Sequence, residues 1–326
     1  MVRYIYMRRV CAIAVFLPLA FAQNPKNDPN QIGARDVSKG VNWYSIQKEM
    51  ALGKQLAQEV EKTHKVVTDM GVTEYVNRVG QNLAAHSDTR IPVTIKVIEG
   101  DEPNAITLPG GYIYVQTGLI RTADTEAQLA AAIAHEIAHV AARHGTRQAT
   151  HEQVGQLATI PLIFLPLGGL CGLGANHVLL PAGLLAEQRG YEKEADMLGL
   201  QYLYKTGYDP LGMVEIFERI FSLDDRKQGK VGRVFSTHPD GDQRLIAVQK
   251  NIESQLAEQE QYVVTTSDFN KMQARLTALD WEKKPEPVGP KPPTLHKSGD
   301  DAATAKKLVP QSTARASQIK EAYNIR

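Results

Sequence analysis

The sequence is poor in cysteine and has almost no excess charge. Its 326 residues include two cysteines, which excludes a framework of several disulfides and a zinc site built from cysteines. Lysine and arginine number 37 against 36 aspartates and glutamates, so no basic excess points to nucleic acid as a partner. With 43% hydrophobic residues, the composition is that of a globular protein and not of a disordered or multi-span membrane protein.

The first 22 residues have the pattern of a secretory signal peptide. Three arginines precede a short apolar run, residues 10–19, and Ala20-Phe21-Ala22 places small residues where a signal peptidase reads them. We therefore expect cleavage before Gln23. The run is shorter than the about 20 apolar residues that a transmembrane helix needs. The alternative interpretation is an uncleaved N-terminal anchor.

Hydrophobic periodicity predicts many helices and a few strands. Alternating β-branched and aromatic residues predict strands at 93–97 and 112–117. Thr125 and Gln128 form a capping box that opens a long alanine-rich helix, which Gly145 can end. Helices are predicted for residues 45–67, for residues around 72–83, from Thr125 to His144, from about Glu187 to Thr206, and for stretches around 214–221 and 245–256.

Composition divides the chain into a domain with two polar ends. After the signal peptide we expect a loose polar leader (23–44), a single domain (45–282), and a proline-rich linker with a disordered tail (283–326). Residues 153–186 contain no charged side chain, and three prolines divide them. We interpret this segment as an apolar hairpin over the active-site cleft, with peripheral membrane contact through 157–186. A true membrane crossing is the alternative.

The motif that carries chemistry is HEIAH, in the predicted long helix. His135 and His139 are four residues apart, so their imidazoles project from one helix face, with Glu136 beside them. In this H-E-x-x-H arrangement the histidines bind Zn²⁺, which lowers the pKa of its water to about 7, and the glutamate takes the proton. A surface helix with incidental histidines is the alternative. The apolar neighbours argue against it, since a buried glutamate is costly without a compensating metal.

A third protein ligand must come from elsewhere, because Gly145 stands where a longer form of the motif has a third histidine. Glu192 and Asp196 share a face of the next helix, so Glu192 is assigned to the metal and Asp196 to an imidazole N–H. Glu194 points the other way. His144, nine positions after His135, is expected on about the opposite side of the helix and is interpreted as structural. A solvated acidic helix start is the alternative. Such a set would hold one ion per chain, with zinc the usual occupant.

Three segments resemble one protein family. HEIAH, EKEAD and NAITLPGGYIYVQTGL are similar to the gluzincin metallopeptidases of the CAAX-prenyl-protease and HtpX type, and most to their secreted, BepA-like bacterial branch. The resemblance covers residues 45–280. It implies an α+β fold: a mostly helical zincin-like domain with a small sheet whose edge strand lines the zinc cleft. By this resemblance, extended substrate pairs with four residues of the edge strand: Tyr112, Ile113, Tyr114 and Val115. From the sequence alone, residues 112–117 are equally consistent with an ordinary sheet strand.

The resemblance also implies two further residues near the metal. The family places a His-Pro pair and a downstream arginine there, matched by His238-Pro239 and Arg244. Both side chains can donate to the oxyanion that forms when a peptide carbonyl is attacked. In BepA-like proteins the corresponding histidine can instead occupy the open zinc position and keep the enzyme latent. The sequence leaves both roles for His238 open.

These observations predict a zinc endopeptidase of the bacterial cell envelope. Glu136 acts as general base, and the substrates are exposed or misfolded proteins of the periplasm, an expectation that comes from the signal peptide and the family. The alternative is an envelope chaperone or assembly factor with a latent peptidase site. A CAAX-type processing enzyme is a third reading, but those are multi-span proteins and this chain offers no run of spans. No feature predicts an oligomeric state.

Overall fold

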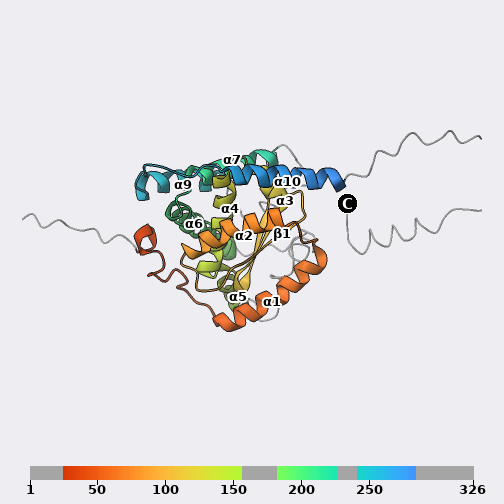
Figure 1. Cartoon of the computed structure of the whole chain (residues 1–326). Helices are drawn as coiled ribbons and strands as arrows, with labels where there is room; N and C mark the ends of the chain where they lie inside the picture. Colours follow the sequence, from red (N-terminus) through yellow and green to blue (C-terminus); the bar gives the residue numbers. More distant parts are fainter. Residues whose placement is uncertain (1–24, 156–181, 226–240, 284–326) are drawn as a thin grey trace, which may run out of the picture.

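The computed structural model describes residues 25–155, 182–225 and 241–283 (Figure 1). The predicted signal peptide, His238, the tail beyond residue 283 and residues 156–181 of the uncharged segment lie outside the described residues. The helices are α1 (Ile46–Thr63), α2 (Met70–Ala85), α3 (Thr117–Thr122), α4 (Glu126–Ala142), α5 (His144–Gly155), α6 (Ala182–Lys205), α7 (Leu211–Asp225), α9 (Gly241–Gln255) and α10 (Ser267–Lys283). The strands are β1 (Thr94–Ile98), β2 (Ala105–Leu108) and β3 (Tyr112–Gln116).

The many helices and the small mixed sheet confirm the predicted α+β class. Each predicted helix and strand is present, whereas β2, α3, α5 and α10 were not predicted. Helix α6 begins at Ala182, five residues before the expected start. Within the described ranges, no helix is both long and apolar enough to cross a membrane.

The strand order is β1-β3-β2, with β1 parallel and β2 antiparallel to β3. The prediction that residues 112–117 form an edge strand is therefore wrong, because β3 has a partner on both sides. The 3-10 turn Pro109–Gly111 folds β2 back onto β3, so that Thr107 lies opposite Ile113. Strand β2, which packs against α4, is the edge strand next to the HEIAH helix.

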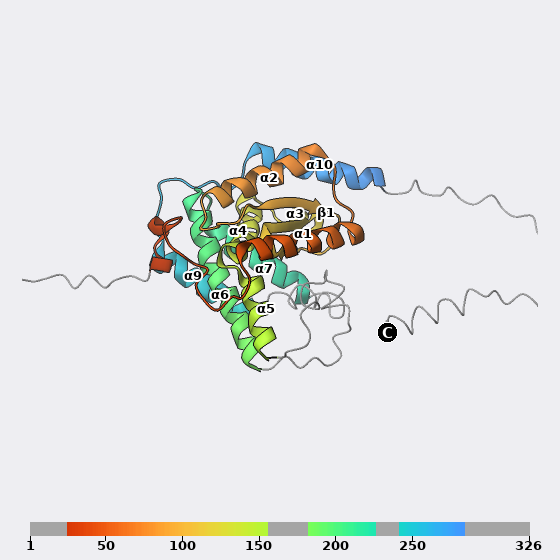
Figure 2. The ribbon, with the colours of Figure 1, turned by 90° about the horizontal axis from the view of Figure 1, so that it is seen from below.

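Helix α4 is the centre of the fold, and every residue in it except His139 is buried. Thr125 caps its first turn by accepting a hydrogen bond from the amide of Gln128 (3.3 Å). The helix packs against α6, α7, α2 and β2, as Figure 2 allows the reader to follow. Its contact with α6 is close at Gly199, where an added Cβ would lie 3.0 Å from the backbone of His135. This closeness brings the acidic residues of α6 to the histidines.

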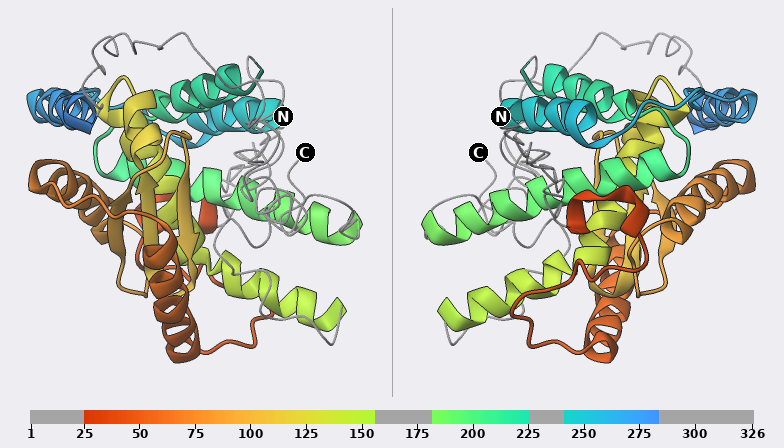
Figure 3. Two further views of the ribbon diagram at one scale, coloured as in Figure 1. Left: turned by 90° about the vertical axis from the view of Figure 1, so that its right-hand side faces the viewer. Right: turned by 90° about the vertical axis from the view of Figure 1, so that its left-hand side faces the viewer.

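Helix α4 ends earlier than predicted, at Ala142 and not at His144. Arg143 adopts the left-handed conformation (φ 57°), and α5 starts in a new direction at His144 (Figure 3). The buried carboxylate of Glu49, on α1, accepts hydrogen bonds from Arg143 Nε (2.6 Å) and Thr146 Oγ1 (2.9 Å). These bonds offset the unfavourable backbone conformation of a residue that is not glycine.

The polar leader is packed against the domain, contrary to the prediction of a loose segment. Arg35 forms an ion pair with Asp88 (2.9 Å) in which both side chains are at most 3% exposed. Tyr202, on α6, donates a hydrogen bond to the same carboxylate (2.8 Å). Lys26 pairs with Glu194 of α6 (2.5 Å). The first part of the leader therefore lies against α6, as the right-hand view of Figure 3 shows.

Candidate metal centre and active site

His135 and His139 of α4 converge with Glu192 of α6. The two Nε2 atoms are 3.1 Å apart, and each lies 3.5 Å from a different carboxylate oxygen of Glu192. His135 and Glu192 are buried, and His139 is partly buried. One atom from each residue belongs to a group whose members all lie within 4.8 Å of one another, as required to share an ion. The structure therefore brings together the three ligands proposed from the sequence.

This donor set fits a zinc ion. Ligand atoms at the usual zinc distances around a tetrahedron are separated by about 3.3 Å, close to the separations found here. The local charge also suits a dication. Three carboxylates (Glu136, Glu192 and Asp196) and the guanidinium of Arg244 gather here, which leaves a net charge of −2 when all are ionised. A buried charge of this size needs a compensating cation.

Asp196 and Arg244 contact the proposed ligands His135 and Glu192 and hold them in place. His135 Nδ1 lies 3.0 Å from an oxygen of Asp196, which fixes the imidazole with Nε2 facing the other ligands. Arg244, on α9, donates from Nε (2.8 Å) and Nη2 (2.7 Å) to Asp196, and its Nη1 lies 3.1 Å from Glu192. Arg244 thus contacts two carboxylates of the site. These contacts support a role in positioning the ligands more directly than the predicted role as an oxyanion donor.

The pKa shifts of this cluster follow from burial opposed by ion pairing. Burial alone raises the pKa of Asp196, but the charge and hydrogen bonds of Arg244, with those of His135, lower it below its usual value. Burial lowers the pKa of His135, yet the hydrogen bonds to Asp196 and Glu192 outweigh it and raise that pKa to about 9. The surrounding carboxylates therefore favour a cation at His135, whether a proton or a metal.

Glu136 lies on the neighbouring side of α4 and is held by the edge strand. Its Oε2 accepts a hydrogen bond from Thr107 Oγ1 (2.5 Å), and Glu136 is 4% exposed. Sequence reasoning missed Thr107 because the strand that carries it is only four residues long. The available signal was its place between Asn104-Ala105 and Pro109-Gly110-Gly111 in the segment that resembles the family.

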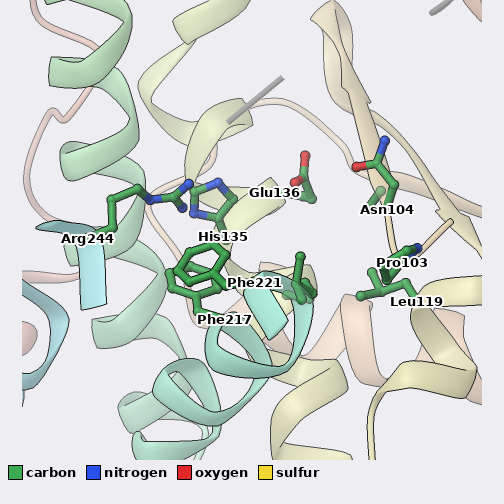
Figure 4. A pocket seen from close by; sticks show the side chains of 11 residues that line it. Pro103, Asn104, Leu119, His135, Glu136, Phe217, Phe221 and Arg244 are labelled. Carbon is green, nitrogen blue, oxygen red and sulfur yellow. The ribbon is translucent and has the colours of Figure 1, made fainter. Parts of the chain in front are cut away.

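An apolar pocket opens beside His135 and Glu136. Phe217 and Phe221 of α7 form its floor below His135, while Asn104 and Leu119 lie on the far side of Glu136 (Figure 4). The guanidinium of Arg244 stacks over the ring of Phe217, 4.7 Å from its centroid. The pocket therefore places a mostly apolar surface beside the carboxylate of Glu136.

The sequence position of His144 predicted that it lies on the opposite side of the HEIAH helix, and this prediction is wrong. Because helix α4 ends before Arg143, the ring of His144 is directed back toward the helix. Its Nδ1 lies 3.0 Å from Nδ1 of His139. The other ring nitrogen, Nε2, contacts Glu194 (3.2 Å). Glu194 is not among the three residues whose ligand atoms converge, and its contact with His144 connects it indirectly to His139.

Two further predictions concern residues 112–115 and His238. The backbone of Tyr112, Ile113, Tyr114 and Val115 is paired on both sides within the sheet, which contradicts a substrate-binding role by strand addition for this strand. His238 lies outside the described residues, so its role stays a prediction.

An H-E-x-x-H helix, a carboxylate from a second helix and a small sheet beside them define a metal-dependent site of the zincin class. The chain belongs to peptidase family M48, whose sequence model matches residues 72–252.

Curated relatives agree with this family. The beta-barrel assembly-enhancing protease of Escherichia coli (strain K12) is 30% identical over 245 residues, which cover 72% of this chain and 49% of the relative. That of Yersinia pestis is 31% identical over 210 residues, 62% of this chain and 43% of the relative. The mitochondrial metalloendopeptidase OMA1 of Schizosaccharomyces pombe is 32% identical over 212 residues, 60% of each. The chain spans about half the length of the assembly-enhancing proteases.

Proposed function

We propose that this chain is a zinc-dependent endopeptidase. The observation that carries the proposal is the convergence of His135, His139 and Glu192 at the separations of a tetrahedral zinc site, with Glu136 beside them. Membership of peptidase family M48 supports the same reaction class.

Zinc held by His135, His139 and Glu192 would polarise both the attacking water and the scissile carbonyl. Glu136 accepts the proton of that water on its carboxylate and returns it to the leaving amine. Thr107 restricts the Glu136 side chain to one orientation through its hydrogen bond. Asp196 and Arg244 keep His135 and Glu192 in place, so that little rearrangement is needed when the substrate arrives.

The surroundings of Glu136 indicate the substrate class. The phenylalanine-floored pocket accepts an apolar side chain next to the reacting bond. Among the described strands, β2 has a partner strand on one side only, so an extended peptide would pair with β2 and not with β3. Apolar side chains on extended backbone are what an unfolded protein exposes. We therefore infer that the substrates are exposed or misfolded proteins.

The predicted signal peptide and the names of the bacterial relatives support a place in the cell envelope, in the periplasm. Peripheral membrane contact through 157–186 rests on the lack of charged residues in that segment and stays a prediction. A relative named for enhancing assembly of β-barrels also supports the rival function, a chaperone or assembly factor with a latent peptidase site.

The Glu136→Gln variant separates the two functions. Casein hydrolysis should disappear in this variant while zinc content stays at one ion per chain, because Gln keeps the shape of Glu136 but cannot take the proton. Glu74→Gln, an exposed change on α2, is the matched control and should leave hydrolysis intact. Hydrolysis that persists in Glu136→Gln contradicts the proposed enzyme. Binding of unfolded clients without any cleavage by the unmodified protein supports the rival.

His238 is tested by its own variant. Removing a latch with His238→Ala should raise the hydrolysis rate, whereas removing an oxyanion donor should lower it. An unchanged rate excludes both roles.

A further inference from the structure

The second metal-ligating histidine has a support that differs from the first. His135 contacts the carboxylate of Asp196 directly, as metal-bound histidines usually do. His139 instead contacts a second imidazole, that of His144, through Nδ1 atoms 3.0 Å apart. His144 then contacts Glu194 Oε2 through its Nε2 (3.2 Å). Two successive contacts, from His139 to His144 and from His144 to Glu194, thus connect the proposed metal site to a carboxylate on α6.

The proton positions in this chain follow from chemistry. If Nε2 of His139 binds the metal, its proton is on Nδ1, which must donate. Nδ1 of His144 must then accept, so the proton of His144 is on Nε2 and points to Glu194. Both contacts are satisfied when His144 is neutral and its Nε2–H donates to an oxygen of Glu194.

The surroundings hold both groups in place. His144 is 3% exposed, and its ring stacks on Tyr191 with the ring centroids 4.6 Å apart. Lys26 Nζ lies 2.5 Å from one oxygen of Glu194, and Arg147 Nη1 lies 3.3 Å from the other. Arg147 also stacks over the Tyr191 ring.

Lys26 ties this support to the leader. Its carbonyl accepts hydrogen bonds from Gln201 of α6 (3.0 Å) and from Arg35 (2.6 Å), which anchors the segment.

We propose that His144 is a positioning residue for the metal site. It fixes His139 in the tautomer that leaves Nε2 for zinc. Glu194, which forms ion pairs with Lys26 and Arg147, fixes His144. This inference rests on the proposed metal site. His144 thus orients the imidazole of His139, as Asp196 orients that of His135.

Two variants of His144 separate this role from simple packing. Asn places an oxygen as many bonds from the backbone as Nδ1, so His144→Asn keeps an acceptor for His139. His144→Leu fills the buried volume better but offers no acceptor. Loss of such a support typically lowers metal affinity 10–100-fold. In competition with a chelator, we expect His144→Leu to bind zinc about 10–100-fold more weakly and His144→Asn to stay within a few fold of the unmodified protein. Equal affinities, or Leu tighter than Asn, overturn the proposal.

A measurement on the unmodified zinc-loaded protein does not depend on whether the variants fold. Nitrogen–proton correlation spectra of the histidine rings should show His139 with its proton on Nδ1 and His144 with its proton on Nε2. A proton on Nδ1 of His144 overturns the proposal. If the protein binds no zinc at all, the proposed function fails. If it binds zinc but His144→Leu has unchanged affinity, only this positioning role fails.

Discussion

Replacing Thr107 by Val tests whether the edge strand orients Glu136, the proposed general base. The substitution keeps the shape and the preference for strand structure but removes the hydroxyl that donates to Glu136 (2.5 Å). Hydrogen bonds to charged groups contribute about 1.5–3 kcal/mol. If this bond holds Glu136 in its reactive orientation, its loss should lower kcat by about tenfold to hundredfold.

The assay is cleavage of a fluorogenic peptide that carries an apolar residue beside the scissile bond, with kcat and KM determined separately. KM and zinc content should change little, because the hydrogen bonds of Thr107 go to Glu136. The Thr107→Ser variant keeps the donor and is the matched control, expected to retain most of the activity. The reasoning is refuted if Thr107→Val keeps kcat within twofold, or if Ser and Val lower it equally.

Three further substitutions test the packing around the site. Arg244→Met breaks a buried ion pair and should lower the free energy of unfolding in urea by about 3–5 kcal/mol. Arg275→Met breaks an exposed pair with Asp69 and should lower it by less than about 1 kcal/mol. Equal losses would contradict the assigned burial. Arg35→Met should likewise cost about 3–5 kcal/mol if the leader is part of the fold, and a cost near zero would show a loose leader. Gly199→Ala should push α6 from α4 and weaken zinc binding in chelator competition, while Gly190→Ala, which meets nothing within 4 Å, should not; unchanged affinity for Gly199→Ala would show that the helix contact is not limiting.

The grouping of the proposed ligands could be predicted because their relation is local. Residues i and i+4 share a helix face whatever the tertiary structure, so His135 with His139, and Glu192 with Asp196, followed from spacing. That the two helices meet was inferred from the need for a third ligand. In the structure, the close contact at Gly199 brings them together.

The errors arose where distant residues decide the local structure. Arg143 ends α4 in a conformation that favours glycine, and the buried Glu49 of α1 stabilises it. No pattern near Arg143 signals this break, so the position of His144 was misjudged. Likewise, the leader looks loose by composition, but Arg35 is paired with Asp88, 53 residues away.

The order of the strands could not be read from periodicity. Strand β2 is short, and its residues Ala105 to Leu108 do not alternate clearly between buried and exposed. Its pairing with β3 depends on the turn at Pro109–Gly111, and this pairing moves β3 from the edge to the middle of the sheet.

The central claim is that one divalent ion is shared by side chains from α4 and α6. Crystals of the zinc-loaded protein, measured on both sides of the zinc absorption edge, test it directly. The account predicts a single strong anomalous peak per chain, in contact with Nε2 of His135, Nε2 of His139 and the carboxylate of Glu192. A peak elsewhere on the chain, or a zinc-saturated crystal without a peak among these three side chains, would contradict it.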